Sequence, residues 1–248
     1  MLSLAAGQTY GIAKKSQLVA VQVDDVTNKF LELFVWEKSI DALSKVYDDI
    51  WDAQGKGHAN GGIDNLWDAV VSMSFTLDLT PGTSLFEAFE MRYYQILEEL
   101  ASWGVSLVAS GGQDDADDSN RRRCNGRLPC SFGSPDYKFH LENMIVVGSG
   151  EINSGDYHEQ DPNNRDNWWT IYAPGWDEDA KGIYCASSTG NDAIIGSGAS
   201  AATALVAGLM AYFKGLGMDG PDARDALVNY AYQRNSNGPK MVWNGVNV

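Results

Sequence analysis

Residues 196–208 read GSGASAATALVAG, and this stretch carries the strongest structural signal in the chain. Glycines precede a run of small and apolar residues, a pattern that predicts a buried helix over 199–214. Ser200 then lies in the first turn of that helix, near free backbone N–H groups and the positive end of the helix dipole. Such N–H groups can stabilise a developing oxyanion, so the turn around Ser200 is a candidate site for chemistry. The same pattern also fits a helix start with a purely structural role.

The rest of the chain alternates between two hydrophobic patterns. Short apolar, β-branched runs predict strands at 16–23, 70–75, 105–110 and 143–148. Longer stretches with helical spacing predict helices at 38–54 and 84–103, in addition to 199–214. Such alternation is typical of an α/β fold with a mainly parallel sheet and helices on both faces. No internal repeat is visible, and 248 residues suffice for one core, so we expect a single domain over 1–248.

Other segments occur in an order that resembles a known family. They are GQTYGIAKKSQLVAV at 7–21, VSMS at 71–74, VASG at 108–111, YAPG at 172–175 and GPKMVWNG at 238–245. Together with 196–208 they resemble the subtilisin-like serine peptidases, or subtilases, and the first and last resemble the proteinase-K-like fungal branch. The resemblance spans nearly the whole chain. It implies a three-layer subtilisin-like fold and a serine endopeptidase that hydrolyses peptide bonds, with Ser200 as nucleophile.

The resemblance also implies a substrate channel. Ser74 and Phe75 fall on the strand that forms one wall of that channel, and Ser110 and Gly111 fall on the strand that leads to the oxyanion position. The implied partner is a peptide or protein substrate.

The sequence departs from the family at the oxyanion position and in the channel. Subtilases usually place an asparagine where this chain has Gly112, which has no side-chain donor. Loss of one such donor typically costs about 2.7–4 kcal/mol of transition-state stabilisation. Gln113 could supply a donor if the loop shifted by one residue. Phe75 stands where the family usually has glycine, so we expect a narrowed or reshaped pocket.

The histidine and aspartate motifs of subtilases precede the segment that begins at Thr9. Only eight residues precede Thr9 here, and none of them is histidine. We therefore expect the chain to begin inside the histidine-bearing helix, so that the N-terminal portion of the fold is lacking. His58 in GKGHAN is a weak substitute because it follows the amphipathic helix, and His140 and His158 fit solvated surface positions. A serine without a base is not activated, so the chain as given is expected to be inactive.

Three readings remain open from the sequence. In the first, an upstream segment supplies the histidine and aspartate, and the chain is part of an active peptidase. In the second, the chain is a pseudoenzyme that binds peptides or proteins without cleaving them. In the third, it is a fragment that folds poorly because core surface is exposed.

Composition narrows the partners. The formal net charge of −15 argues against nucleic acid, and no apolar run reaches the length of a membrane helix. We expect a monomer with no membrane partner. The first residues lack the features of a signal peptide, although the resemblance to the family implies a secreted parent protein.

No cofactor or metal site is expected. The acidic run at 114–118 could bind a structural calcium ion, but a solvated loop that pairs with the arginines at 121–123 fits better. The histidines are scattered and match no zinc-ligand spacing. Cys124 and Cys130 are close enough in sequence for a disulfide, while Cys185 stands alone.

Overall fold

The computed structural model describes residues 1–21, 32–78, 84–112, 124, 127–153, 156–159, 168–179, 181–187, 193–234, 236 and 238–243. At 32–34, 78, 84–85, 153 and 156–159 it describes the backbone alone. Gln113 and the acidic run at 114–118 lie outside these ranges.

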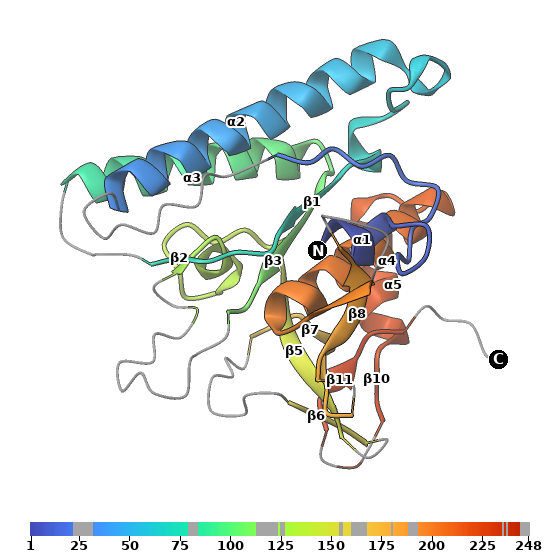
Figure 1. Cartoon of the computed structure of the whole chain (residues 1–248). Helices are drawn as coiled ribbons and strands as arrows, with labels where there is room; N and C mark the ends of the chain where they lie inside the picture. The colour runs from blue at the N-terminus through green and yellow to red at the C-terminus, as the bar shows by residue number, and fades with distance from the viewer. Residues whose placement is uncertain are drawn as a thin grey trace.

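A seven-stranded sheet forms the middle layer of the protein (Figure 1). Its strands are, in spatial order, β1 (Val70–Met73), β3 (Ser106–Ser110), β5 (Ile145–Asn153), β7 (Ile171–Asp177), β11 (Lys240–Met241) and β10 (Tyr232–Gln233), with β6 (Asp156–Glu159) pairing with β5. From β1 to β11 each neighbouring pair is parallel, whereas β10 and β6 pair antiparallel. The mainly parallel sheet agrees with the alternating sequence pattern.

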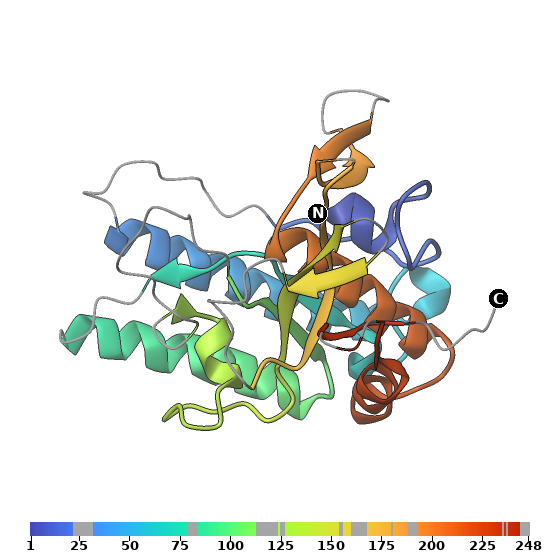
Figure 2. The same ribbon diagram turned by 90° about the horizontal axis from the view of Figure 1, so that it is seen from below.

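Helices cover both faces of the sheet. In Figure 2 the helices α2 (Glu32–Lys56) and α3 (Ser84–Ser102) lie on one side, and α4 (Ala199–Gly215) and α5 (Gly220–Tyr230) lie on the other. Strand β3 lies between the two helix layers, and all five of its residues are buried. Leu107 and Ala109 pack in the cluster with α3, while Val108 packs in the cluster with α4. The fold is therefore the expected three-layer α/β arrangement.

Shorter elements complete the described structure. They are α1 (Leu2–Ala6), the 3-10 turns η2 (His58–Asn60), η3 (Leu66–Asp68) and η4 (Cys130–Gly133), the pair β2 (Leu77–Asp78) and β4 (Arg127–Leu128), and the ribbon of β8 (Ile183–Ala186) and β9 (Ala193–Gly196). Helix α1 packs closely on α4. The two helices approach so closely at Gly208 that a side chain there would clash with the main-chain oxygen of Ala5.

The predicted strand at 16–23 is wrong over its described part. Residues 17–21 adopt no regular secondary structure and pair with no strand in the described ranges. Leu18 is 45% exposed and Val19 58% exposed, so the apolar run is not buried. A strand needs a hydrogen-bonded neighbour, and β1, the edge strand of the sheet, does not pair with this segment. Residues 22 and 23 lie outside the described residues.

Candidate active site

Ser200 lies in the first turn of α4, as its sequence context predicts. The helix begins after Gly198, which has a φ of 80°, a conformation that glycine adopts at no steric cost. The N–H of Gly198 donates to the carbonyl oxygen of Gly175 at 2.7 Å and so fixes the turn to strand β7. The central helix therefore presents a partly exposed serine from a firmly held turn.

The hydroxyl of Ser200 contacts the segment that follows β1. Its Oγ donates a hydrogen bond to the main-chain oxygen of Ser74 at 2.8 Å. Two of the predicted site residues, 126 positions apart in sequence, are thus brought together by the fold. A neutral amide oxygen accepts a hydrogen bond but cannot take the proton as a base, so this contact holds the hydroxyl without activating it.

The segment at 110–112 lies beside Ser74 in the architecture, because β3 and β1 are neighbouring parallel strands and both segments follow their carboxyl ends. The N–H of Gly111 donates to the oxygen of Val147 at 2.9 Å, and the N–H of Gly112 donates to Ser110 Oγ at 3.3 Å. Gly112 has a φ of 84°. The predicted oxyanion region is therefore a left-handed turn whose described N–H groups are directed to the protein itself.

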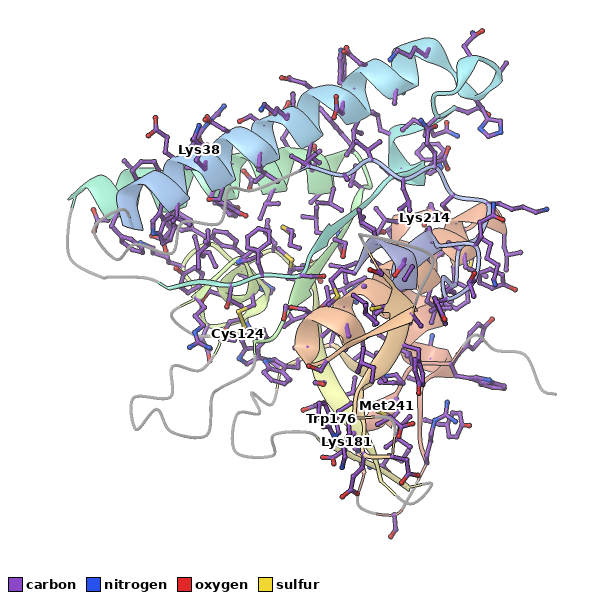
Figure 3. All side chains as sticks on the ribbon, viewed as in Figure 1. Lys38, Cys124, Trp176, Lys181, Lys214 and Met241 are labelled. Carbon is purple, nitrogen blue, oxygen red and sulfur yellow. A yellow bond between two sulfur atoms is a disulfide. The ribbon has the colours of Figure 1, made fainter. Side chains whose placement is uncertain are left out.

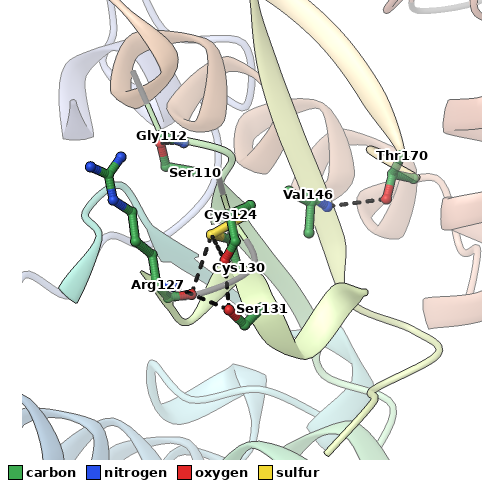
Figure 4. The surroundings of a disulfide bond; sticks show 8 residues. All are labelled: Ser110, Gly112, Cys124, Arg127, Cys130, Ser131, Val146 and Thr170. Atoms are coloured by element: carbon green, nitrogen blue, oxygen red, sulfur yellow. Dashed lines mark hydrogen bonds between the residues drawn. A yellow bond between two sulfur atoms is a disulfide. The ribbon is translucent and has the colours of Figure 1, made fainter. Parts of the chain in front are cut away.

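A guanidinium group lies next to Gly112, and sequence reasoning missed it. A Cβ placed on Gly112 would lie 3.4 Å from Nη1 of Arg127 and 3.7 Å from Cγ2 of Thr76. Arg127 therefore lies close to the space that a side chain at Gly112 would enter (Figure 4). The sequence signal was indirect: Arg127 stands within the short loop that Cys124 and Cys130 bracket.

That loop is closed by the Cys124–Cys130 disulfide, with the two Cα atoms 5.8 Å apart. Ser131 Oγ donates to the oxygen of Cys124 at 2.6 Å, and the N–H of Arg127 donates to Ser131 Oγ at 3.2 Å (Figure 4). These bonds hold the main chain at Arg127, from which its side chain reaches the neighbourhood of Gly112.

Phe75, expected in the channel, is partly buried and packs against the core cluster that contains Tyr93 and Met73. It thus fills space between the sheet and the layer formed by α2 and α3. Its neighbour Ser74 is also partly buried, and its Oγ lies 3.5 Å from Ser72 Oγ.

None of the described histidine side chains is hydrogen-bonded to Ser200. His58 is exposed in η2, where its main-chain N–H donates to Asp64 Oδ1 at 3.0 Å, and His140 is exposed in the loop before β5. The side chain of His158 lies outside the described part of the structure. Among the described residues, no histidine is therefore hydrogen-bonded to the candidate nucleophile.

Within the described ranges, no group of three His, Cys, Asp or Glu side chains is arranged to hold a metal ion. Among the helices described, none combines the length and apolar character that crossing a bilayer requires.

A buried lysine lies in the last turn of α4, at the opposite end of the helix from Ser200. Lys214 is 5% exposed, and its Nζ donates to the oxygen of Gly104 at 3.1 Å and to that of Trp67 (Figure 3). Burial lowers the pKa of Lys214 to about 8, against the opposing effect of the Asp68 and Asp219 carboxylates. The sequence placed this lysine on α4 but could not show that it caps two carbonyl groups.

The fold and these contacts define a class of protein. It is a three-layer α/β protein in which the central helix presents a serine to the carboxyl ends of neighbouring parallel strands.

The chain belongs to the subtilase family (Peptidase S8), which residues 3–243 match. It is 29% identical over 215 residues to Subtilisin-like protease 2 of Pseudogymnoascus destructans, covering 86% of this chain and 40% of that protein. The chain thus spans less than half of this curated relative.

Solved structures show the same fold. A cold-adapted subtilisin-like serine proteinase superposes with a TM-score of 0.61 at 19% identity, covering 99% of this chain and 73% of the other. A chain of the subtilase cytotoxin SubAB assembly gives a TM-score of 0.63 at 17% identity, covering 98% and 72%. The predicted family and the predicted fold class are both confirmed.

Proposed function

We propose that this chain is a serine endopeptidase domain in which Ser200 is the nucleophile, and that the chain as given does not hydrolyse peptides. Membership of the subtilase family supports the first half of the proposal. The contact between Ser200 Oγ and the Ser74 oxygen carries the second half, because the hydroxyl proton is directed to a group that is not a base.

The substrate is a peptide or protein segment that lies between the segments after β1 and β3. Ser74 lies on one side of this segment, with Phe75 packed behind it in the core, and Ser110 and Gly111 lead to the other side. In attack on the scissile carbonyl, Ser200 Oγ would form a bond to the carbonyl carbon and lose its proton to a base. Free N–H groups in the first turn of α4 would stabilise the resulting oxyanion.

Gly112 supplies no side-chain donor to that oxyanion, and its N–H is directed to Ser110. Arg127 carries donor groups and lies beside Gly112, which makes it a candidate replacement. A guanidinium group is always charged and can donate to an oxyanion without changing its protonation state.

A second candidate function is peptide binding without cleavage. The Ser200 hydroxyl and the Gly112 N–H both form hydrogen bonds within the protein, so neither group needs a substrate as its hydrogen-bond partner. In this case the channel would hold a peptide, and Ser200 would have a structural role.

Labelling with a fluorophosphonate probe tests the proposal, with Ser200→Ala as control. We expect no labelling in plain buffer. Added imidazole supplies the missing base, so labelling that depends on Ser200 should then appear. Labelling in plain buffer would contradict the inactivity of the chain. A folded protein that stays unlabelled at high imidazole concentration would contradict the role of Ser200 as a positioned nucleophile and favour peptide binding.

A further inference from the structure

Three aromatic rings form a cluster where the second half of α2 meets the end of α3. Tyr47 and Trp51 lie one turn apart on α2, and Trp103 directly follows the last residue of α3. The ring centroid of Trp103 lies 4.5 Å from that of Tyr47 and 5.4 Å from that of Trp51. We call these three residues the aromatic platform.

The platform is open to solvent. Trp51 is 55% exposed, whereas tryptophan is highly buried on average in folded proteins. Trp103 contacts both rings of α2, so the three rings leave no space between them for a ligand. A ligand would therefore lie on the outer surface of the platform, against the exposed part of Trp51. Exposed tryptophans of this kind are common at interaction surfaces.

Carboxylates border the platform. Glu99 belongs to α3 and accepts a hydrogen bond from the hydroxyl of Tyr47 at 2.7 Å. Asp48 and Asp52 are exposed on α2, each directly after a platform residue. Among the described residues, no basic side chain forms an ion pair with either aspartate. The exposed rings thus lie in a negatively charged setting.

The backbone adds to this negative potential. Helix α3 ends directly before Trp103, and its last turn contains no basic residue to offset the partial negative charge of a helix C-terminus. The hydrogen bond to Glu99 is the main cause that raises the pKa of Tyr47, and the charge of Asp48 contributes to the same shift. Arg92 opposes the shift with a smaller effect.

These features favour a guanidinium group as the ligand. It is planar and positively charged, it stacks on aromatic rings, and its N–H groups match the oxygens of a carboxylate. A quaternary ammonium ion is typically enclosed in a cage of rings, which the contacting rings of the platform do not form. A neutral sugar could stack on Trp51 but would leave the charges of Asp48 and Asp52 uncompensated.

We propose that the aromatic platform binds an arginine side chain of a partner polypeptide. The guanidinium group stacks on Trp51 and donates to the bordering carboxylates. Trp103 precedes β3 whereas Gly111 follows it, so the platform lies at the opposite end of this strand from the proposed substrate channel. The site is therefore additional to the proposed function and does not depend on Ser200 being a nucleophile.

Nuclear magnetic resonance of the whole chain, labelled with nitrogen-15 in its indole groups, measures binding. The probe is the capped peptide Gly-Ser-Arg-Ser-Gly, and Trp51→Phe assigns the indole signal of Trp51. We expect a saturable shift of this signal with a dissociation constant of about 1 mM, because one side chain supplies only part of an interface.

Two matched peptides test the chemistry of recognition. Replacing arginine by citrulline keeps the shape and removes the charge, and should weaken binding about fivefold or more. Replacing arginine by lysine keeps the charge and removes the planar group, and should weaken binding about threefold. Binding should also weaken as salt is added, because the carboxylates are exposed.

Matched variants locate the site. Trp51→Ala, followed on the Trp103 signal, should weaken binding about threefold or more, whereas Tyr184→Ala removes a ring that is 54% exposed on β8 and should have no effect. Asp52→Asn should weaken binding about twofold, and Asp225→Asn, which removes an exposed charge on α5, should not. Ser200→Ala should bind the peptide as the unaltered protein does.

Three results would overturn the proposal. They are an unchanged Trp51 signal at saturating peptide, equal binding of the citrulline peptide, and unaltered binding by Trp51→Ala. A Trp51 signal that shifts with a neutral oligosaccharide and not with the peptide would also overturn it, and would assign the platform to carbohydrate. If Trp51→Ala failed to fold, the peptide comparisons on the unaltered protein would decide.

Discussion

Ser200 Oγ and the main-chain oxygen of Ser74 are joined by a 2.8 Å hydrogen bond that links the start of α4 to the segment after β1. We expect Ser200→Ala to lower the free energy of unfolding by only about 0.5–1.5 kcal/mol, because one hydrogen bond of a partly exposed hydroxyl is lost. Urea denaturation measures this. A loss of several kcal/mol would show that the serine is chiefly a structural residue, as in the second candidate function.

Restoring a donor at the oxyanion position tests the proposed chemistry. Asparagine tolerates the left-handed conformation of Gly112, and Arg127 and Thr76 are far enough away to admit a Cβ. We expect Gly112→Asn to raise the imidazole-dependent labelling of Ser200, by up to about 100-fold if the amide reaches the oxyanion. Gly112→Ala is the control, because it adds a Cβ at the same position without a donor. Equal labelling of the two variants would count against an oxyanion role for this turn.

The role of Arg127 is tested separately. If its guanidinium group assists the oxyanion, Arg127→Ala should reduce imidazole-dependent labelling about tenfold or more, and Arg127→Lys should restore part of it through its positive charge. Probe concentration should be varied so that the labelling rate and the probe affinity are obtained separately. An unchanged rate in Arg127→Ala would assign this arginine to the fold alone.

Gly208 and Gly215 form a matched pair on α4. A Cβ at Gly208 clashes with the main chain of Ala5, whereas a Cβ at Gly215 meets no atom within 4 Å. Gly208→Ala should therefore destabilise the protein by about 1–3 kcal/mol, because α1 must move. Gly215→Ala should stabilise it by about 0.5–1 kcal/mol, through the higher helix propensity of alanine. Thermal unfolding of both variants checks the opposite signs.

Lys214 makes stability depend on pH. Its folded pKa of about 8 lies below that of an unfolded lysine, so between about pH 8 and 10.5 the unfolded chain binds more protons. The free energy of unfolding, relative to Lys214→Met, should therefore rise with pH across this window, by at most about 1.4 kcal/mol per unit. Below pH 8 the difference should be constant. If the difference in unfolding free energy between the two proteins were independent of pH throughout, burial would not lower the pKa of Lys214.

The elements with a strong local pattern could be predicted from the sequence. Helix α3 and strand β3 follow from their apolar spacing, and the glycine-flanked run of small residues at 196–208 predicted the helix whose first turn holds Ser200. The run at 16–23 could not be assigned correctly, because its apolar pattern says nothing about whether a neighbouring strand is there to pair with it. Arg127 was missed for a similar reason, since its position beside Gly112 depends on a tertiary fold that no local pattern encodes.

The position of α4 in the sequence also determines when the sheet can be covered during folding. It contacts β1, β3, β5 and β7, as well as α1 and α5, yet it is encoded by residues 199–215. During synthesis all four of these strands leave the ribosome before the helix that covers one face of their sheet. Their apolar residues on that face, such as Val108 and Val147, stay uncovered until residues 199–215 have been synthesised. This layer can therefore be completed only after all four strands have been synthesised, and until then their apolar face is exposed to aggregation.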